Sequence, residues 1–138
     1  MSQENVEVVQ AAIEAFDAED MEAVREMLDP DVIVVRGLEG WPEPAPVVGR
    51  EAVMRLWQGI FEPWDAWTLK ALSFVDGGDR VLVRQVMHGE GRGPELDMEF
   101  SVVYTMRKGN ALVLEYFWDH NEALETVGLS EQDAHADS

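Results

Sequence analysis

The side chains that could do chemistry in this sequence are few, and most of them fall within apolar, strand-like segments. Gln85, Tyr104 and Tyr116 each stand in such a segment. Amide and phenol groups at these positions donate and accept hydrogen bonds, which suits them to orienting a ligand. Asp119 lies near the end of the last segment and adds a carboxylate, which can act as a general base in a pocket or cap the turn that follows.

Aromatic and apolar residues accompany these polar groups at the spacing expected for a pocket wall. Met87 alternates with Gln85, and Phe100 alternates with Tyr104, so each pair shares one face of a strand. Trp57 lies at helical spacing from other apolar residues and is expected to face the sheet. Each of these residues can also serve as ordinary core packing. The residues expected to line a ligand pocket are Trp41, Trp57, Gln85, Met87, Phe100, Tyr104, Tyr116 and Trp118.

The composition excludes several classes of site and partner. The sequence has no cysteine, and its three histidines are scattered, so we expect no disulfide, no metal site and no cofactor. Its net charge of −18 repels phosphate backbones and anionic lipids, so neither nucleic acid nor a membrane is an expected partner. The acidic start lacks the basic and apolar pattern of a secretory signal, and we expect a cytoplasmic protein.

Three helices are predicted before the main run of strands. The first covers about residues 3–18, where apolar residues recur every three or four positions. Asp20 caps a short second helix, which is expected to stop before the Asp29-Pro30-Asp31 segment. A third helix opens at Gly49 and ends near Pro63. Residues 37–48 contain two glycines, three prolines and Trp41, and are expected to form an irregular loop that folds over something.

The strand-like segments predict a curved, antiparallel meander. A first strand covers Val32 to Val35, and four more follow: Ala66 to Val75, Arg80 to Glu90, Leu96 to Arg107, and Ala111 to His120. Three helices set against such a sheet cannot close it into a tube, so they leave a cone-shaped cavity on its concave face. We therefore predict an α+β fold with one domain over residues 1–129, then a polar tail over residues 130–138.

Nearly the whole chain, from Asn5 to Leu129, resembles SnoaL-like members of the nuclear transport factor 2-like superfamily. The motifs that carry the resemblance are Ala15-Phe16, Asp20, Leu28-Asp29-Pro30-Asp31, Gly49-Arg50-Glu51-Ala52, Trp118-Asp119 and Glu122-Ala123-Leu124. The resemblance implies a cone of three N-terminal helices packed on a curved, mostly antiparallel sheet. It also implies a small hydrophobic molecule as the ligand.

A homodimer is a further expectation from the resemblance, because proteins of this fold commonly pair through the convex face of the sheet. Arg84 and His88 fall on that face, and Arg84 is expected to meet an acid such as Glu115 or Glu99. The face also carries an alternating apolar set, which would suit a dimer contact. Its members are Leu82, Val86, Val103, Val113 and Phe117.

Two activities of related proteins depend on side chains that this chain does not have in full. Ketosteroid isomerases of this fold use a tyrosine and two aspartates, and the matching positions hold Ala12, Arg36 and Val102, so we reject that activity. Limonene-epoxide-hydrolase-like members use an arginine and two aspartates. Gln85, Met87 and Asp119 stand there, and the single retained carboxylate makes this reading a minor alternative.

Polyketide cyclases of the SnoaL-like kind resemble the chain most closely at Trp118-Asp119. By that resemblance, Asp119 would remove the acidic proton of a carbonyl compound in an aldol ring closure, chemistry that a single desolvated carboxylate can support. The alternative is a non-catalytic protein that binds a hydrophobic ligand or acts as a dimeric scaffold, since the polar residues of the inner face are few. The sequence leaves open whether the protein is an enzyme.

Overall fold

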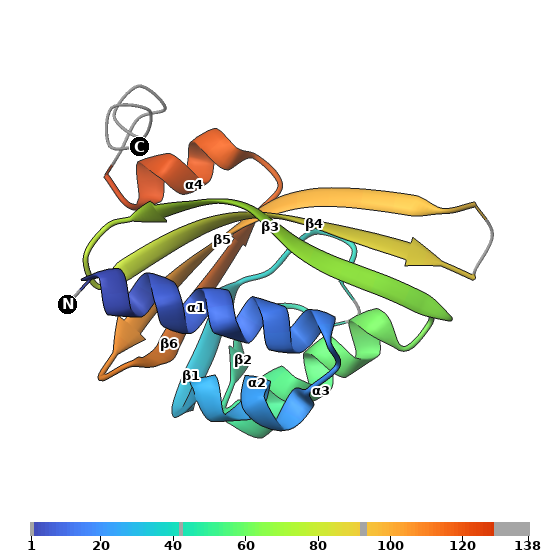
Figure 1. Ribbon diagram of the computed structural model, residues 1–138, viewed down its shortest axis with the longest axis horizontal. Coiled ribbons are helices and arrows are strands. Elements are labelled where there is room, and N and C mark those ends of the chain that lie inside the picture. Colours follow the sequence, from blue (N-terminus) through green and yellow to red (C-terminus); the bar gives the residue numbers. More distant parts are fainter. Residues whose placement is uncertain (1, 42, 92–93, 129–138) are drawn as a thin grey trace.

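The computed structural model describes residues 2–41, 43–91 and 94–128, and Figure 1 shows their arrangement. The elements are α1 (Ser2–Asp17), α2 (Met21–Met27), β1 (Leu28–Arg36), β2 (Val47–Val48), α3 (Arg50–Phe61), β3 (Ala66–Asp76), β4 (Arg80–Glu90), β5 (Leu96–Arg107), β6 (Asn110–Phe117) and α4 (His120–Thr126). Among these residues, no helix combines the length and apolarity that crossing a membrane requires.

One six-stranded sheet carries the fold, with strand order β2-β1-β6-β5-β4-β3. Strands β3 to β6 form the predicted antiparallel meander, and β1 pairs in parallel with β6. Helices α1, α2 and α3 lie on one face of the sheet, and α4 lies on the other (Figure 1). The predicted α+β architecture is confirmed, with a fourth helix added at the C-terminal end.

The helices begin and end close to their predicted positions for the expected physical reasons. Val9, Ile13 and Phe16 form the buried stripe of α1. The Asp20 carboxylate caps α2 by accepting the Ala23 N–H at 3.3 Å. Gly49 precedes α3 with φ +96°, a backbone conformation that residues with a Cβ rarely adopt.

Strand β1 begins earlier than predicted, because the Asp29-Pro30-Asp31 segment belongs to it. The Asp29 carboxylate accepts the Asp31 N–H at 2.8 Å and the Arg107 guanidinium at 2.9 Å. These contacts, the backbone hydrogen bond foremost, lower the pKa of Asp29. The register of β1 against β6 shifts between Leu28 and Ile33, so the strand absorbs the proline in an irregular stretch. The loop predicted over residues 37–48 likewise contains the short strand β2 at its end.

Helix α4 covers part of the convex face on which a dimer contact was predicted. Ala123 and Leu124 of α4 form a second core with three residues of that face: Leu82, Val103 and Phe117. Much of the predicted apolar surface is therefore buried within the chain, while Val86 and Val113 stay partly exposed. The predicted ion pair on this face is present, with Arg84 Nε 2.6 Å from Glu99 Oε1. Homodimerisation remains a prediction.

Candidate functional site

A cavity of about 60 Å³ lies between the three N-terminal helices and the concave face of the sheet. Its walls are almost wholly apolar. The helices contribute Ala12, Ile13, Phe16, Val24, Met27, Trp57, Ile60 and Phe61; the sheet contributes Leu69, Gln85, Met87, Met98, Phe100, Tyr104 and Tyr116; and the loop after β1 contributes Trp41. An apolar hollow with a few polar groups is the usual form of a small-molecule site.

Gln85 and Tyr104 form one of two buried polar pairs in this cavity. They stand on adjacent strands, β4 and β5, and Gln85 Nε2 donates to the Tyr104 hydroxyl at 3.0 Å. Gln85 is 2% exposed, so its amide is held inside the cone as the strand alternation predicted. Burial raises the pKa of Tyr104 to about 12, and the hydrogen bond from Gln85 offsets only part of that rise.

Trp57 and Tyr116 form the second pair, which joins α3 to β6. Trp57 Nε1 donates to the Tyr116 hydroxyl at 3.0 Å, and both side chains are buried. Burial, and next the neighbouring Tyr104, raise the pKa of Tyr116 well above its ordinary value. The indole is thus used for positioning, since its only hydrogen-bonding proton is already donated.

Both phenols are therefore neutral at physiological pH, and each keeps a hydroxyl proton that it can donate. Each hydroxyl oxygen accepts one bond, and among the described residues no acceptor takes either hydroxyl proton. The cavity lining described above includes no carboxylate, lysine, arginine or histidine. The arrangement can donate two hydrogen bonds to a ligand in dry surroundings, where such bonds are strong.

Trp41 reaches the cavity because the loop after β1 folds back over the sheet. Its ring packs edge-on against Tyr116, with the ring centroids 4.6 Å apart. A Cβ on Gly37 would lie 2.7 Å from the Trp41 ring, so the missing side chain at Gly37 lets the indole approach the backbone. This loop was predicted to fold over another part of the molecule, and its Trp41 indole closes one end of the cavity.

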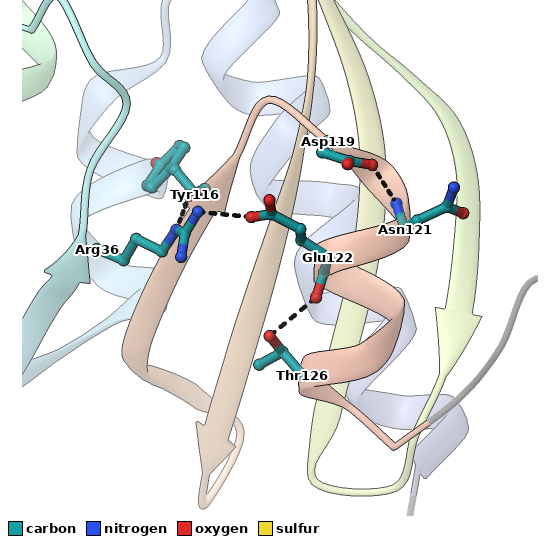
Figure 2. A network of polar contacts seen from close by, with 6 residues as sticks. All are labelled: Arg36, Tyr116, Asp119, Asn121, Glu122 and Thr126. Atoms are coloured by element: carbon teal, nitrogen blue, oxygen red, sulfur yellow. Dashed lines mark hydrogen bonds and ion pairs between the residues drawn. The ribbon is translucent and has the colours of Figure 1, made fainter.

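Asp119 and Trp118 lie outside the cavity, unlike the other predicted site residues. Strand β6 ends at Phe117 and not at His120, and the chain turns into α4. Asp119 is exposed and caps α4 by accepting the Asn121 N–H at 2.9 Å (Figure 2). Trp118 is 48% exposed. The alternation that would have placed Trp118 with Tyr116 stops where the strand stops, so the expected pocket base is a helix cap in this structure.

Arg36 helps to hold this end of the strand, as Figure 2 shows. Its guanidinium donates to the Tyr116 carbonyl at 3.3 Å and pairs with Glu122 of α4 at 2.8 Å. It also lies over the Phe117 ring, 4.4 Å from the ring centroid. Arg36, which was matched to the aspartate base of ketosteroid isomerases, thus has a structural role in this chain.

Replacing Asp119 separates its capping role from a catalytic one. We expect Asp119→Ala to lower the free energy of unfolding by about 1 kcal/mol, the usual cost of losing a side-chain cap. Asp119→Asn keeps a capping oxygen and should unfold at the same urea concentration as the wild type. Neither change should alter ligand affinity. Weaker ligand binding by a fully folded Asp119→Asn protein would contradict this assignment.

The described residues contain one grouping that could hold a metal ion, at the far end of the β4–β5 hairpin. Ligand atoms of His88, Glu90 and Glu95 lie within 4.8 Å of one another. His88 Nδ1 is already 2.6 Å from Asp97, and this hydrogen bond, ahead of the charges of nearby acids, raises the pKa of His88. The grouping is explained by the partly buried His88 imidazole, which is hydrogen-bonded to Asp97 and lies among carboxylates. Its members meet across the hairpin, which histidine spacing in the sequence could not reveal.

Comparison with protein-family models identifies the family to which the chain belongs. The model of the SnoaL-like domain matches residues 9–115, which include the second half of α1, all of α2, α3 and β1 to β5, and most of β6. The chain belongs to the SnoaL-like domain family. A search of curated protein sequences finds no significant match to this SnoaL-like domain.

Solved structures share the fold of this SnoaL-like domain. A nuclear transport factor 2-like protein of unknown function from Burkholderia pseudomallei is 21% identical, with a TM-score of 0.73 over 90% of this chain and 97% of that one. TerC, co-crystallised with polyporic acid, is 23% identical, with a TM-score of 0.73 over 91% and 98% of the two chains. Rv0760c of Mycobacterium tuberculosis, in complex with estradiol-17β-hemisuccinate, is 17% identical, with a TM-score of 0.70 over 84% and 94%. These likenesses establish the nuclear transport factor 2-like fold.

Several lining residues of this SnoaL-like domain were not predicted as site residues. They are mainly helical side chains such as Ala12, Ile13 and Phe16, together with Met98 and Leu69 on the strands. Their helical spacing and strand alternation indicated burial. Neither signal distinguishes a side chain that packs against its neighbour from one that borders an empty space.

Proposed function

We propose that this SnoaL-like domain binds a small hydrophobic molecule through a carbonyl or similar hydrogen-bond acceptor. The observation that carries the proposal is the pair of neutral hydroxyls, Tyr104 and Tyr116, in an otherwise apolar cavity. Their protons have no acceptor among the described residues, so a ligand oxygen between them would complete both hydrogen bonds. A ligand without an acceptor would leave these buried donors unpaired, which costs affinity.

The fold neighbours support a small molecule as the ligand. Polyporic acid with TerC and an estradiol derivative with Rv0760c are both small molecules. Trp41, Trp57, Gln85, Met87 and Phe100 would form the binding surface in this chain, as the sequence analysis expected. Trp118 is left out of the proposed site, because it is exposed and does not line the cavity.

A cyclase-like reaction is a second candidate that the two donors favour. Two neutral hydroxyls aimed at one carbonyl oxygen would stabilise the enolate that forms when a neighbouring carbon loses its proton. The cavity lining has no carboxylate to take that proton, and Asp119 caps α4. This reaction therefore needs a base that the described cavity does not supply. Loss of turnover in Asp119→Asn, with binding retained, would favour it over binding alone.

The proposal predicts that the protein distinguishes a ketone from a hydrocarbon of the same shape. Acetylnaphthalene and isopropenylnaphthalene differ by an oxygen in place of a methylene group. We expect the ketone to bind about tenfold more tightly, because the hydrocarbon leaves the hydroxyls of Tyr104 and Tyr116 unpaired. Isothermal titration calorimetry of the purified protein with both compounds measures the ratio.

Tyr104→Phe is the variant that tests the role of the hydroxyl. Removing this donor should reduce the preference for the ketone to about threefold while changing hydrocarbon affinity little. Phe100→Leu is a useful control, because it alters the wall without removing a hydrogen-bonding group, and it should leave the ratio near its wild-type value. Equal affinity of the wild-type protein for the two compounds would refute the proposed recognition.

A further inference from the structure

A second, larger hollow adjoins the cavity on the side where α1, α3 and β3 meet. Its volume is about 520 Å³, against about 60 Å³ for the cavity. Phe16, Trp57 and Phe61 line both spaces, so these three side chains border the cavity on one side and the hollow on the other. The cavity by itself holds little more than one end of a ring-containing molecule. A larger ligand would need further space, and this second hollow, which we call the outer groove, adjoins the cavity.

The outer groove combines aromatic surface with negative charge. Trp64 and Trp67 are half-buried in its wall, and Phe61 packs against Trp67 with ring centroids 4.2 Å apart. Glu19 and Glu62 are exposed at the groove and are its only charged lining residues among those the structure describes. Indole faces and carboxylates are the two groups that attract an organic cation most strongly.

Two backbone features show that the positions of these groups are built into the fold. A Cβ on Gly89 would lie 2.6 Å from the Trp64 ring, so Trp64 can occupy its place only because β4 has a glycine there. Glu19 has φ +60°, in the left-handed region that favours glycine. This turn sets the direction in which the Glu19 side chain leaves the backbone.

We propose that the outer groove is the second half of the ligand site and that the ligand carries a cationic amine at its outer end. The proposal rests on the proposed function, since the acceptor end of the same molecule occupies the cavity. The ring system of the ligand would pass between the three shared aromatic residues, whose ring contacts in this structure would have to part, and would end beside Trp64 and Trp67. Glu19 and Glu62 would then neutralise the amine, and they would repel a carboxylate at the same place.

Three acetylnaphthalenes that differ only on the far ring test this inference. They carry an aminomethyl, a hydroxymethyl or a carboxylate group there, and calorimetry gives the affinity of each. We expect the amine to bind about tenfold more tightly than the alcohol, from two exposed carboxylates worth roughly threefold each. The carboxylate should bind about tenfold more weakly than the alcohol. Raising the salt concentration should reduce the differences in affinity among the three compounds, because exposed charges are screened.

The double variant Glu19→Gln/Glu62→Gln should bring all three affinities close to that of the alcohol. Its matched control is Glu7→Gln/Glu125→Gln, which removes the same net charge from exposed sites near the start of α1 and on α4. The control should keep most of the discrimination. Equal loss of discrimination in both double variants would assign it to overall charge and overturn the inference.

The same series separates failure of this inference from failure of the proposed function. If the alcohol binds and Tyr104→Phe weakens it, but the amine and the carboxylate bind equally well, the cavity proposal stands and the charged groove is refuted. If none of the three compounds binds the folded protein, both proposals are overturned. Tighter binding of the carboxylate than of the amine would likewise refute the inference.

Discussion

Trp57→Ala is expected to lower the free energy of unfolding by about 3–5 kcal/mol, the usual range when a buried aromatic side chain is removed. Trp57 is 6% exposed and packs edge-on against Phe16, with ring centroids 5.3 Å apart. Its N–H donates to the Tyr116 hydroxyl, which would lose that partner inside the core. Urea unfolding followed by circular dichroism measures the change without depending on indole fluorescence.

Trp118→Ala is the matched control for this prediction. The substitution is the same, but Trp118 is 48% exposed and borders neither the cavity nor the core. We expect a change within about 0.5 kcal/mol, as is usual at the surface. Trp57→Phe keeps a ring and loses the N–H, so it should fall between the two variants. If Trp57→Ala cost no more than Trp118→Ala, the indole would not be the structural link between α3 and β6 that the contacts indicate.

Neither tyrosine should ionise in the folded protein until well above pH 10. The free energy of unfolding should fall as the pH rises far enough to ionise them. The sequence contains only Tyr104 and Tyr116, so the absorbance of tyrosinate reports the cavity alone. In the unfolded chain both phenols lose their protons near pH 10. In the fold the pKa of Tyr104 is about 12, and that of Tyr116 is raised well above its ordinary value.

The sign of the pH dependence follows from those two states. Above about pH 10 the unfolded chain has released protons that the folded chain still holds, so alkali favours unfolding. The stability present below pH 10 is progressively lost as the pH rises through the folded pKa. For Tyr104 alone, a rise from 10.0 to about 12 corresponds to about 3 kcal/mol.

Absorbance and circular dichroism recorded along one alkaline titration check this prediction. Tyrosinate should appear together with loss of the fold, and Tyr104→Phe should move the alkaline unfolding midpoint to higher pH. Titration of the protein in urea gives the unfolded reference. Tyrosinate formation near pH 10 in a protein that stays folded would show that the hydroxyls are solvated, and it would remove the basis for the proposed recognition of a carbonyl.

Local periodicity in the sequence was enough to predict the elements and the direction of most side chains. A strand turns alternate residues to opposite faces, so Gln85, Met87, Phe100 and Tyr104 had to share a face once any one of them was placed inside. The buried stripe of α1 followed in the same way from its helical spacing. These periodicities depend only on neighbours along the chain, and the structure places these four residues on the cavity wall.

Sequence patterns alone predicted an α+β cone with Tyr104 and Gln85 facing its interior, and sequence motifs indicated a SnoaL-like protein. Only the tertiary structure decided that β6 ends at Phe117, which leaves Asp119 as a cap, and that α4 covers the face predicted for dimer contact. It also decided that Glu19 and Glu62 share one groove with two tryptophans. The reason is physical: where a strand ends, and which distant segments meet, depends on long-range packing and capping that short-range periodicity does not encode.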